Sequence, residues 1–292
     1  METNKTPLPS IVRATARLLG KWSARFHYAR TVEPFWIDTV RLEMPVANLP
    51  PELDGTKIVQ LSDFHCGEHL PDAHLKSVIQ AVEQESPQVL VLTGDYVDHC
   101  GSQAKWIRDF FGNFKAPMGT YCVLGNHDFS VHTAAGKRRD PDRPQIIHDA
   151  LVDVGLTVLR NEVAWLGEPG NGLAIAGLDD LWSQECDVDL ALGGIGPEVP
   201  RLLLAHNPLT VEQLSSHRCD VMFSGHTHGG QVLLEKWGRI FIGKRSRHLA
   251  AGLCYHNDVP VYVNRGIGFG WQFRYRVRPE ITSIVLRTKN PA

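Results

Sequence analysis

Short apolar runs alternate with amphipathic stretches along most of the chain. The runs at 57–63 and 89–95 consist largely of Val, Ile and Leu, and each ends in Asp. Between them, Leu75, Val78 and Val82 recur at the spacing of one helix face, after a Pro-Asp pair that is typical of a helix start. This order predicts two parallel strands joined by a helix, so we expect both aspartates at the same edge of a buried sheet.

The same alternation continues toward residue 228. We expect further strands at 120–125, 156–166, 173–178, 201–205 and 219–224, and helices at 102–114, 144–154 and 209–216. From residue 231 onward, β-rich runs separated by Gly and Pro replace the helical pattern, which predicts a second, more antiparallel sheet. The expected fold is α/β, with one domain over residues 51–290 that follows a lead-in segment at 1–50.

The N-terminal segment is basic and amphipathic. Residues 3–32 contain six Lys or Arg and no acid, and Ile11, Leu18, Trp22 and Phe26 lie near helical spacing. Two interpretations are open. The helix lies on an anionic membrane surface, or it docks on the protein's own body.

The composition is that of a soluble globular protein, with 292 residues, 43% of them hydrophobic, and a formal net charge of -2. Six cysteines form no CxxC pair, which argues against a zinc cluster or a disulfide framework. No apolar run is long enough to span a membrane, and Arg13, Arg17 and Lys21 interrupt the first apolar stretches before a secretory signal could form. We expect a cytoplasmic location, and the basic N-terminal segment extends this to peripheral contact with the inner face of the membrane.

Polar side chains that can bind metals follow five of the predicted strands. They are Asp63 and His65, Asp95, Asn126 with His127 and Asp128, His206, and His226 with His228. An isolated Asp-x-His or His-x-His is usually a solvated loop pair, but five such groups at strand ends point to one shared edge, and several adjoin glycines that permit close backbone approach. A mixture of Asp, Asn and His suits first-row divalent ions such as Mn, Fe or Zn.

In their order along the chain these motifs resemble those of the calcineurin-like metallophosphoesterases. The resemblance rests on DFH at 63–65, GDYVD at 94–98, GNHD at 125–128, AHNP at 205–208 and GHTH at 225–228. It implies a four-layer α/β/β/α sandwich of two mixed sheets, with a dinuclear metal site at the C-terminal ends of the strands. The family's two divalent ions would be Mn, Fe, Zn or Ni.

The resemblance also implies a ligand set for each ion. One ion would be surrounded by Asp63, His65, Asp95 and His228. The other would be surrounded by Asp95, Asn126, His206 and His226, so that the Asp95 carboxylate bridges the pair. In this scheme a metal-bound hydroxide attacks phosphorus in a phosphodiester or pyrophosphate.

His127 has no metal in the family scheme and is therefore the candidate general acid or charge stabiliser. Asp128 beside it is expected to fix the tautomer of its ring. Asp98 is open to two interpretations, a partner behind the ligands or an exposed acid at a helix start. Nothing in the spacing makes ligands of the remaining nearby histidines, which are His69, His74, His99 and His132.

The segment 229–278 is basic and aromatic, with nine Lys or Arg against two acids. Such a segment marks a nucleic-acid surface, an anionic membrane surface or a phosphate-rich substrate site. A twisted strand with exposed Arg and buried aromatic residues explains 271–278 equally well. We assign Lys244, Arg245 and Arg247, which follow the metal histidines, to the substrate phosphate or headgroup.

The tail, with GHTHGGQ at 225–231, VNRGIG at 263–268 and RPEI at 278–281, further resembles a bacterial branch of the family that includes membrane-associated phosphodiesterases and UDP-2,3-diacylglucosamine pyrophosphatases. We therefore expect a two-metal phosphohydrolase that acts on a phosphodiester or pyrophosphate, with a lipid-linked substrate such as UDP-2,3-diacylglucosamine. A nuclease, a phosphoprotein phosphatase and a catalytically silent metal-binding scaffold remain alternatives, because the motifs do not encode the substrate pocket.

Overall fold

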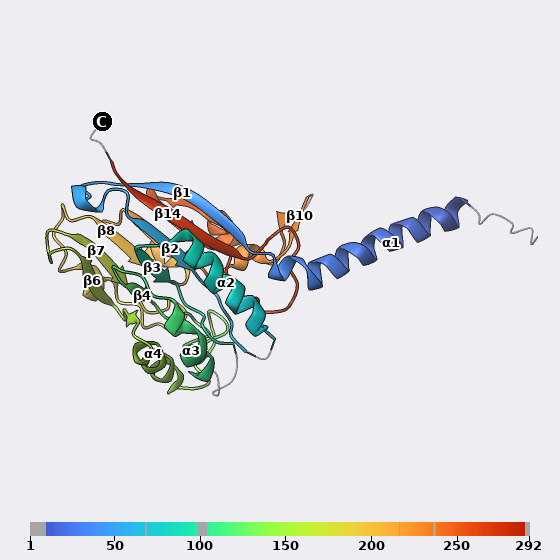
Figure 1. Cartoon of the computed structure of the whole chain (residues 1–292), viewed down its shortest axis with the longest axis horizontal. Helices are drawn as coiled ribbons and strands as arrows, with labels where there is room; N and C mark the ends of the chain where they lie inside the picture. Colours follow the sequence, from blue (N-terminus) through green and yellow to red (C-terminus); the bar gives the residue numbers. More distant parts are fainter. Residues whose placement is uncertain (1–9, 68, 99–103, 216, 236–237, 290–292) are drawn as a thin grey trace, which may run out of the picture.

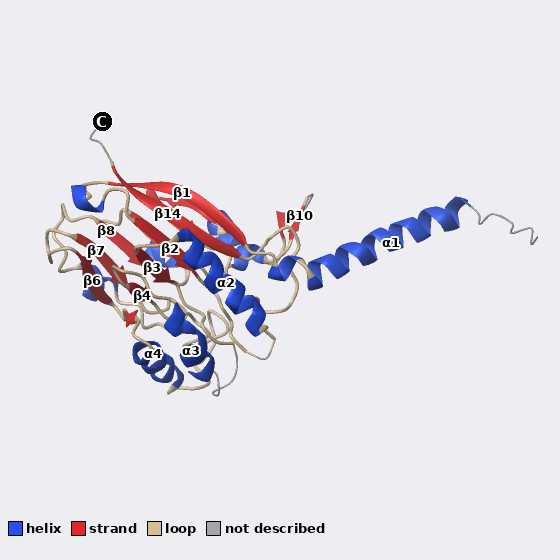
Figure 2. Ribbon diagram, in the orientation of Figure 1, coloured by secondary structure: helices blue, strands red, loops and turns tan. Residues whose placement is uncertain are grey.

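In a computed structural model, two six-stranded mixed sheets lie face to face and helices cover their outer faces (Figure 1). The structure describes residues 10–67, 69–98, 104–215, 217–235 and 238–289. The α-helices are α1 (Ser10–Thr31), α2 (Asp72–Glu85), α3 (Ala104–Phe110), α4 (Arg143–Asp153) and α5 (Val188–Leu192). Figure 2 shows how the helices flank the strands.

Across the first sheet the order is β1 (Asp38–Val46), β14 (Glu280–Thr288), β2 (Lys57–Leu61), β3 (Val89–Leu92), β4 (Thr120–Cys122) and β5 (Thr157–Val158). Across the second it is β12 (Gly252–His256), β13 (Val259–Val263), β9 (Val221–Ser224), β8 (Arg201–Leu204), β7 (Leu173–Gly177) and β6 (Glu162–Leu166). A short ribbon pairs β10 (Leu233–Leu234) with β11 (Gly238–Arg239).

Three hydrophobic cores explain the four layers. The central core lies between the sheets and joins residues such as Ile58 and Val91 of the first to Leu204 and Phe223 of the second. A second core packs the outer face of the first sheet against α2, α3 and α4. The third packs the second sheet against α5 and the 3-10 helix Pro208–Gln213. Strands with apolar residues on both faces are buried on both sides, as their unbroken Val, Ile and Leu runs predicted.

Apart from the short ribbon β10–β11, the β-rich tail does not form a sheet of its own, which corrects the sequence-based expectation. Strands β12 and β13 extend the second sheet, whereas β14 enters the first sheet between β1 and β2. The sequence also did not predict β1, which pairs in parallel with β14 from Asp38↔Glu280 to Val46↔Thr288, so the first sheet begins before residue 51. The expected helix at 209–216 is a 3-10 helix that ends at Gln213.

Helix α1 lies apart from the two-sheet body over most of its length (Figure 1). Its C-terminal end docks on the loop that precedes β14, where Arg274 N donates to Ala29 O at 2.8 Å and the rings of Phe26 and Phe273 lie 5.4 Å apart. Leu18 and Trp22 are mostly exposed. Among the described residues, no helix is both long and apolar enough for a membrane span. Residues 3–9 of the expected helix, and His99, lie outside the described residues.

Candidate metal centre

The five groups of polar side chains meet at one end of the sandwich. Asp63, Asp95 and Asn126 follow β2, β3 and β4 of the first sheet, and His206 and His226 follow β8 and β9 of the second. Two hydrogen bonds join the sheets at this end. Gln60 Nε2 of the first sheet donates to Ser224 O of the second, and His206 Nδ1 of the second donates to Thr93 O of the first. The site is therefore built by the C-terminal strand ends of both sheets.

The side chains point at one another. His206 Nε2 lies 3.1 Å from Asp95 Oδ2, and His65 Nε2 lies 3.6 Å from the same oxygen. On one side His228 Nε2 lies 2.9 Å from His65 Nε2 and 3.4 Å from Asp63 Oδ1. These contacts bring all but two of the predicted ligands around the Asp95 carboxylate.

Asn126 and His226 complete the group. Asn126 Nδ2 donates to Val131 O at 2.7 Å, which turns Asn126 Oδ1 toward His226 Nδ1 at 2.8 Å. The rings of His206 and His226 lie edge to face with centroids 5.1 Å apart. The structure thus brings together all seven side chains that the sequence analysis named as ligands.

The backbone at these positions is unusual. Five of the seven candidate ligands have φ between +46° and +69°, in the left-handed region: Asp63, His65, Asp95, His226 and His228. For non-glycine residues this conformation costs about 1–3 kcal/mol each, and it persists where the surroundings enforce it. The fold therefore stabilises strained loop conformations that direct these side chains toward one another.

Glycines allow the loops to approach closely. A Cβ on Gly225 would lie 1.9 Å from Ser62 Oγ and 2.3 Å from Asp63 Oδ2. A Cβ on Gly125 would lie 2.2 Å from Asp95 Oδ1. Both positions exclude any side chain, because real Cβ atoms do not come so near to other heavy atoms.

The protonation states suit cation binding. Burial lowers the pKa of His65 and of His226 to about 3, so both rings are neutral at pH 7 and offer a lone pair. Burial also opposes a charge on His206, but the carboxylates of Asp95 and Asp63 raise its pKa to about 10. The buried carboxylates thus create a field that favours positive charge at this point.

The free ring atoms also fit a metal site. His206 Nδ1 donates to the Thr93 carbonyl at 2.7 Å, which leaves Nε2 as the nitrogen that faces Asp95. His65 and His228 likewise turn Nε2 to the carboxylates, at 3.6 Å from Asp95 Oδ2 and 3.4 Å from Asp63 Oδ1. Carboxylate, amide and imidazole donors without sulfur are the set that first-row divalent ions accept.

Asp128 differs from its expected role. Its carboxylate accepts hydrogen bonds from the backbone N–H groups of Asp95, Gly125 and Tyr96, at 2.8, 2.8 and 2.9 Å. It is therefore Asp98 that lies beside the His127 ring, with Oδ1 3.5 Å from Nδ1. Both oxygen atoms of the Asp128 carboxylate face the backbone, because the buried N–H groups of Asp95, Tyr96 and Gly125 need an acceptor.

Three residues near the centre were not singled out in the sequence as part of it. Trp182 stands edge to face with His226, with ring centroids 4.4 Å apart, and His132 lies 4.7 Å from His127 in the same way. Asp180 is buried, and burial raises its pKa to about 6. Asp179 and Asp180, which follow β7 after Leu178, were a usable sequence signal for this loop, whereas the spacing of His132 gave none.

The basic residues of the tail differ in their exposure to solvent. Lys244, Arg245 and Arg247 are exposed on the 3-10 helix Lys244–Leu249, and Arg245 pairs with Glu212. Arg274 is fully buried and donates to the backbone carbonyls of the loop 265–268. Since Trp271 is half-exposed, the interpretation of 271–278 as a strand with exposed Arg and buried aromatic residues is wrong.

Comparison with known proteins gives one family and several relatives to which this chain is similar. The family described as calcineurin-like phosphoesterase matches residues 56–230. The uncharacterized metallophosphoesterase YkuE of Bacillus subtilis is 30% identical over 91% of this chain and 91% of its own. The UDP-2,3-diacylglucosamine pyrophosphatase LpxG of Chlamydia trachomatis is 30% identical over 87% of this chain and 90% of its own. The phosphodiesterase YaeI of Escherichia coli is 29% identical over 94% of this chain and 97% of its own.

These matches extend well beyond the motifs. The family match covers more than half of the chain and includes the loops after β2, β3, β4, β8 and β9. Among the candidate ligands of this chain, Asp63, His65 and His228 form one group that could hold a metal ion, and Asp63, Asp95 and His206 form another. The chain therefore belongs to the calcineurin-like phosphoesterase family, as a metal-dependent hydrolase that acts on phosphoester bonds.

Proposed function

We propose that the seven converging side chains hold two divalent cations and that the centre cleaves a phosphodiester or pyrophosphate bond. The observation that carries the proposal is the position of the Asp95 carboxylate, with Oδ2 3.1 Å from His206 Nε2 and 3.6 Å from His65 Nε2. A carboxylate in this place, between two donor sets, would be shared by both ions. The first set is Asp63, His65 and His228, and the second is Asn126, His206 and His226. When bound, such ions neutralise phosphate oxygens and lower the pKa of an attacking water.

We assign His127 as the general acid. Its ring meets that of His65 edge to face, with centroids 4.7 Å apart, which places it beside the proposed ligands. Burial opposes its positive charge, but Asp95 and Asp98 outweigh burial and raise the pKa of His127 to about 9. A protonated imidazole in this place donates its proton to the departing oxygen. Asp98 acts as its positioning residue.

We propose a lipid-linked phosphoester or pyrophosphate as the substrate class, taken up at the cytoplasmic face of an anionic membrane. The name of the relative LpxG supports the lipid-linked substrate, and the exposed apolar residues of α1 support membrane contact. We assign Lys244, Arg245 and Arg247 to the headgroup, because Thr227 Oγ1 donates to Ala250 O at 2.7 Å and so ties the end of their helix to the metal loop. Mn, Fe, Zn and Ni all suit the donor set.

Turnover of bis(p-nitrophenyl) phosphate by the purified chain tests the reaction. We expect hydrolysis with added Mn that a chelator suppresses. Loss of all turnover in protein that still binds two metals would instead identify a silent scaffold. A second screen compares UDP-diacylglucosamine with cyclic nucleotides, single-stranded DNA and phosphopeptides. Preference for DNA or for phosphopeptides would replace the lipid assignment with a nuclease or a phosphatase.

A further inference from the structure

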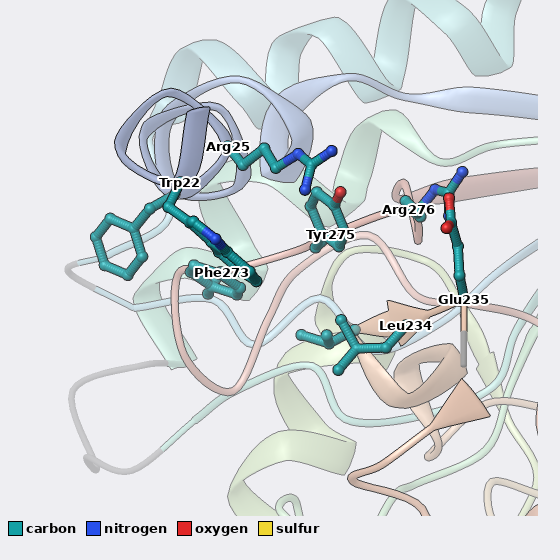
Figure 3. A pocket seen from close by; sticks show the side chains of 9 residues that line it. Trp22, Arg25, Leu234, Glu235, Phe273, Tyr275 and Arg276 are labelled. Carbon is teal, nitrogen blue, oxygen red and sulfur yellow. The ribbon is translucent and has the colours of Figure 1, made fainter. Parts of the chain in front are cut away.

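An apolar pocket of about 610 Å³ lies between α1 and the body (Figure 3), and none of the candidate ligands is among its lining residues. Its lining residues are Trp22, Arg25, Phe26, Val232, Leu234, Glu235, Phe273, Tyr275 and Arg276. Figure 3 shows the aromatic rings of Trp22 and Phe273 together on one wall and Leu234 on the opposite wall. The size and the lining suit a hydrocarbon chain.

A second pocket of about 550 Å³ adjoins the first and is rich in arginine. Its lining residues are Arg25, Tyr28, Glu33, Asp38, Arg265, Tyr275, Arg276 and Arg278. The two pockets share Arg25, Tyr275 and Arg276, so the apolar space and the basic space meet at a common wall. The apolar pocket matches the acyl chain of a phospholipid, and the arginine-rich pocket matches its phosphate.

The charges of the second pocket are only partly neutralised within the protein. Arg265 pairs with Asp38, and Arg276 pairs with Glu235, in each case at 2.8 Å. By contrast, no carboxylate of the described residues lies within ion-pair distance of Arg25 or Arg278; Arg278 instead lies over the Trp36 ring, 3.9 Å from its centroid. Two arginines are thus available for an anion at the edge of the apolar pocket.

The surface around the pockets is apolar. Trp22 and Phe26 are 64% and 58% exposed although both line the first pocket, and Leu18 and Leu19 extend the same exposed surface along α1. Trp271 is half-exposed and stacks on Phe273 with ring centroids 5.2 Å apart. Large exposed apolar residues beside arginines are typical of a surface that enters the headgroup region of a bilayer.

We propose that the two pockets form one binding site for an anionic membrane phospholipid. One acyl chain occupies the pocket lined by Phe26, Leu234 and Phe273, and the phosphate lies between Arg25 and Arg278. The inference rests on the proposed membrane contact and names the lipid and its site. It does not depend on the identity of the substrate.

Hydrogen bonds connect the proposed lipid site to the loop that carries His226 and His228. Gln231, three residues after His228, donates from Nε2 to Trp271 O and to Phe273 O, each at 2.9 Å, and Tyr275 N donates to Gln231 O at 2.8 Å. A lipid that packs against Phe273 therefore contacts a loop that is hydrogen-bonded to the segment following His228. Bound phospholipid places the metal centre next to the membrane surface.

Sedimentation with vesicles tests the site, using the full chain. We compare phosphatidylcholine vesicles with vesicles that contain about a third phosphatidylglycerol. Wild type is expected to partition at least about tenfold more strongly onto the anionic vesicles, and Arg25→Glu with Arg278→Glu is expected to remove that preference. Leu234→Asp, which puts a charge into the apolar pocket, is expected to weaken binding to both vesicle types.

Matched controls outside the lining of both pockets are Lys76→Glu with Lys115→Glu, which makes the same change in net charge, and Leu190→Asp for the apolar change, since all three side chains are exposed. All variants are required to show the circular dichroism spectrum and the melting temperature of wild type, which shows that they fold and keeps this test separate from that of the reaction. Equal binding of pocket variants and controls would overturn the site. So would binding that a chelator abolishes, because the lipid would then engage the metals, or a dimer in light scattering that only Leu234→Asp dissociates, because a second copy would then occupy the pocket.

Discussion

The carboxylate of Asp128 accepts a hydrogen bond from the backbone N–H of Asp95, with Oδ2 2.8 Å from the nitrogen. In return, Asp95 Oδ1 accepts from the backbone N–H of His127 at 2.9 Å. The loops after β3 and β4 are thus fastened to each other by two aspartates, one of which also belongs to the proposed ligand set. The left-handed φ of Asp95 is held by this reciprocal pair.

Asp128→Asn is predicted to destabilise the fold by about 1–3 kcal/mol, because the new amide group opposes buried N–H donors and leaves at least one of them unsatisfied. Urea unfolding measures the change. Asp98→Asn is the matched comparison, since Asp98 is only partly buried and is expected to lower turnover through His127 with little effect on stability. If Asp128→Asn instead keeps full stability and loses turnover, Asp128 acts on the His127 ring, as the sequence analysis expected.

Asp95→Ala is predicted to abolish metal-dependent hydrolysis and to reduce bound metal from two ions toward none. The reason is that a shared carboxylate contributes to both ions, whereas any other ligand contributes to one. Elemental analysis of the purified protein and the bis(p-nitrophenyl) phosphate assay check the two parts. Turnover close to that of wild type would remove the two-metal mechanism.

His127→Ala is predicted to keep both metals and to lose about 10² to 10⁴ in kcat, the range of acid-base assistance. The effect is expected to shrink for substrates with a good leaving group, because such a group departs without a proton. A series of aryl phosphodiesters of decreasing leaving-group pKa measures this trend. If metal content falls together with activity, His127 is a ligand and the assignment as acid is wrong.

Gly225→Ala is predicted to destabilise the protein by about 1–3 kcal/mol or more, since the added methyl collides with Ser62 Oγ and with Asp63 Oδ2, and the loop must move. Metal affinity is expected to fall with it, because Asp63 is a proposed ligand. Gly194→Ala is the control, with no heavy atom within 4 Å of the added Cβ. Thermal unfolding with and without added Mn compares them, and equal melting temperatures would show that the loop tolerates the methyl.

Arg274→Lys is predicted to destabilise the chain by about 2–5 kcal/mol, because a lysine reaches fewer of the carbonyls that the buried guanidinium satisfies. Burial lowers the pKa of Arg274 to about 9, which still leaves the guanidinium charged at neutral pH. Unfolding in urea measures the loss, with exposed Arg139→Lys as the control. An unchanged midpoint would show that the charge, and not its geometry, is what the loop needs.

Much of the candidate site was predictable because it consists of short motifs directly after apolar runs. Asp63, Asp95 and Asn126 each follow a parallel strand, and parallel neighbours bring their ends to one edge. The role of Asp128 was not predictable, because adjacency to His127 in sequence does not determine which way a side chain turns. Its direction follows from buried N–H groups of a loop some thirty residues away, which need an acceptor.

The sequence by itself determined the donor chemistry, the family and the strands that carry the ligands, since these depend on residue type and local order. Only the tertiary structure decided that β14 enters the first sheet while β12 and β13 join the second, and that Arg274 is buried. It also decided that α1 encloses a pocket with the loop before β14. The physical reason is that an apolar run requires burial and a backbone group requires a partner, but neither requirement specifies which distant segment provides it.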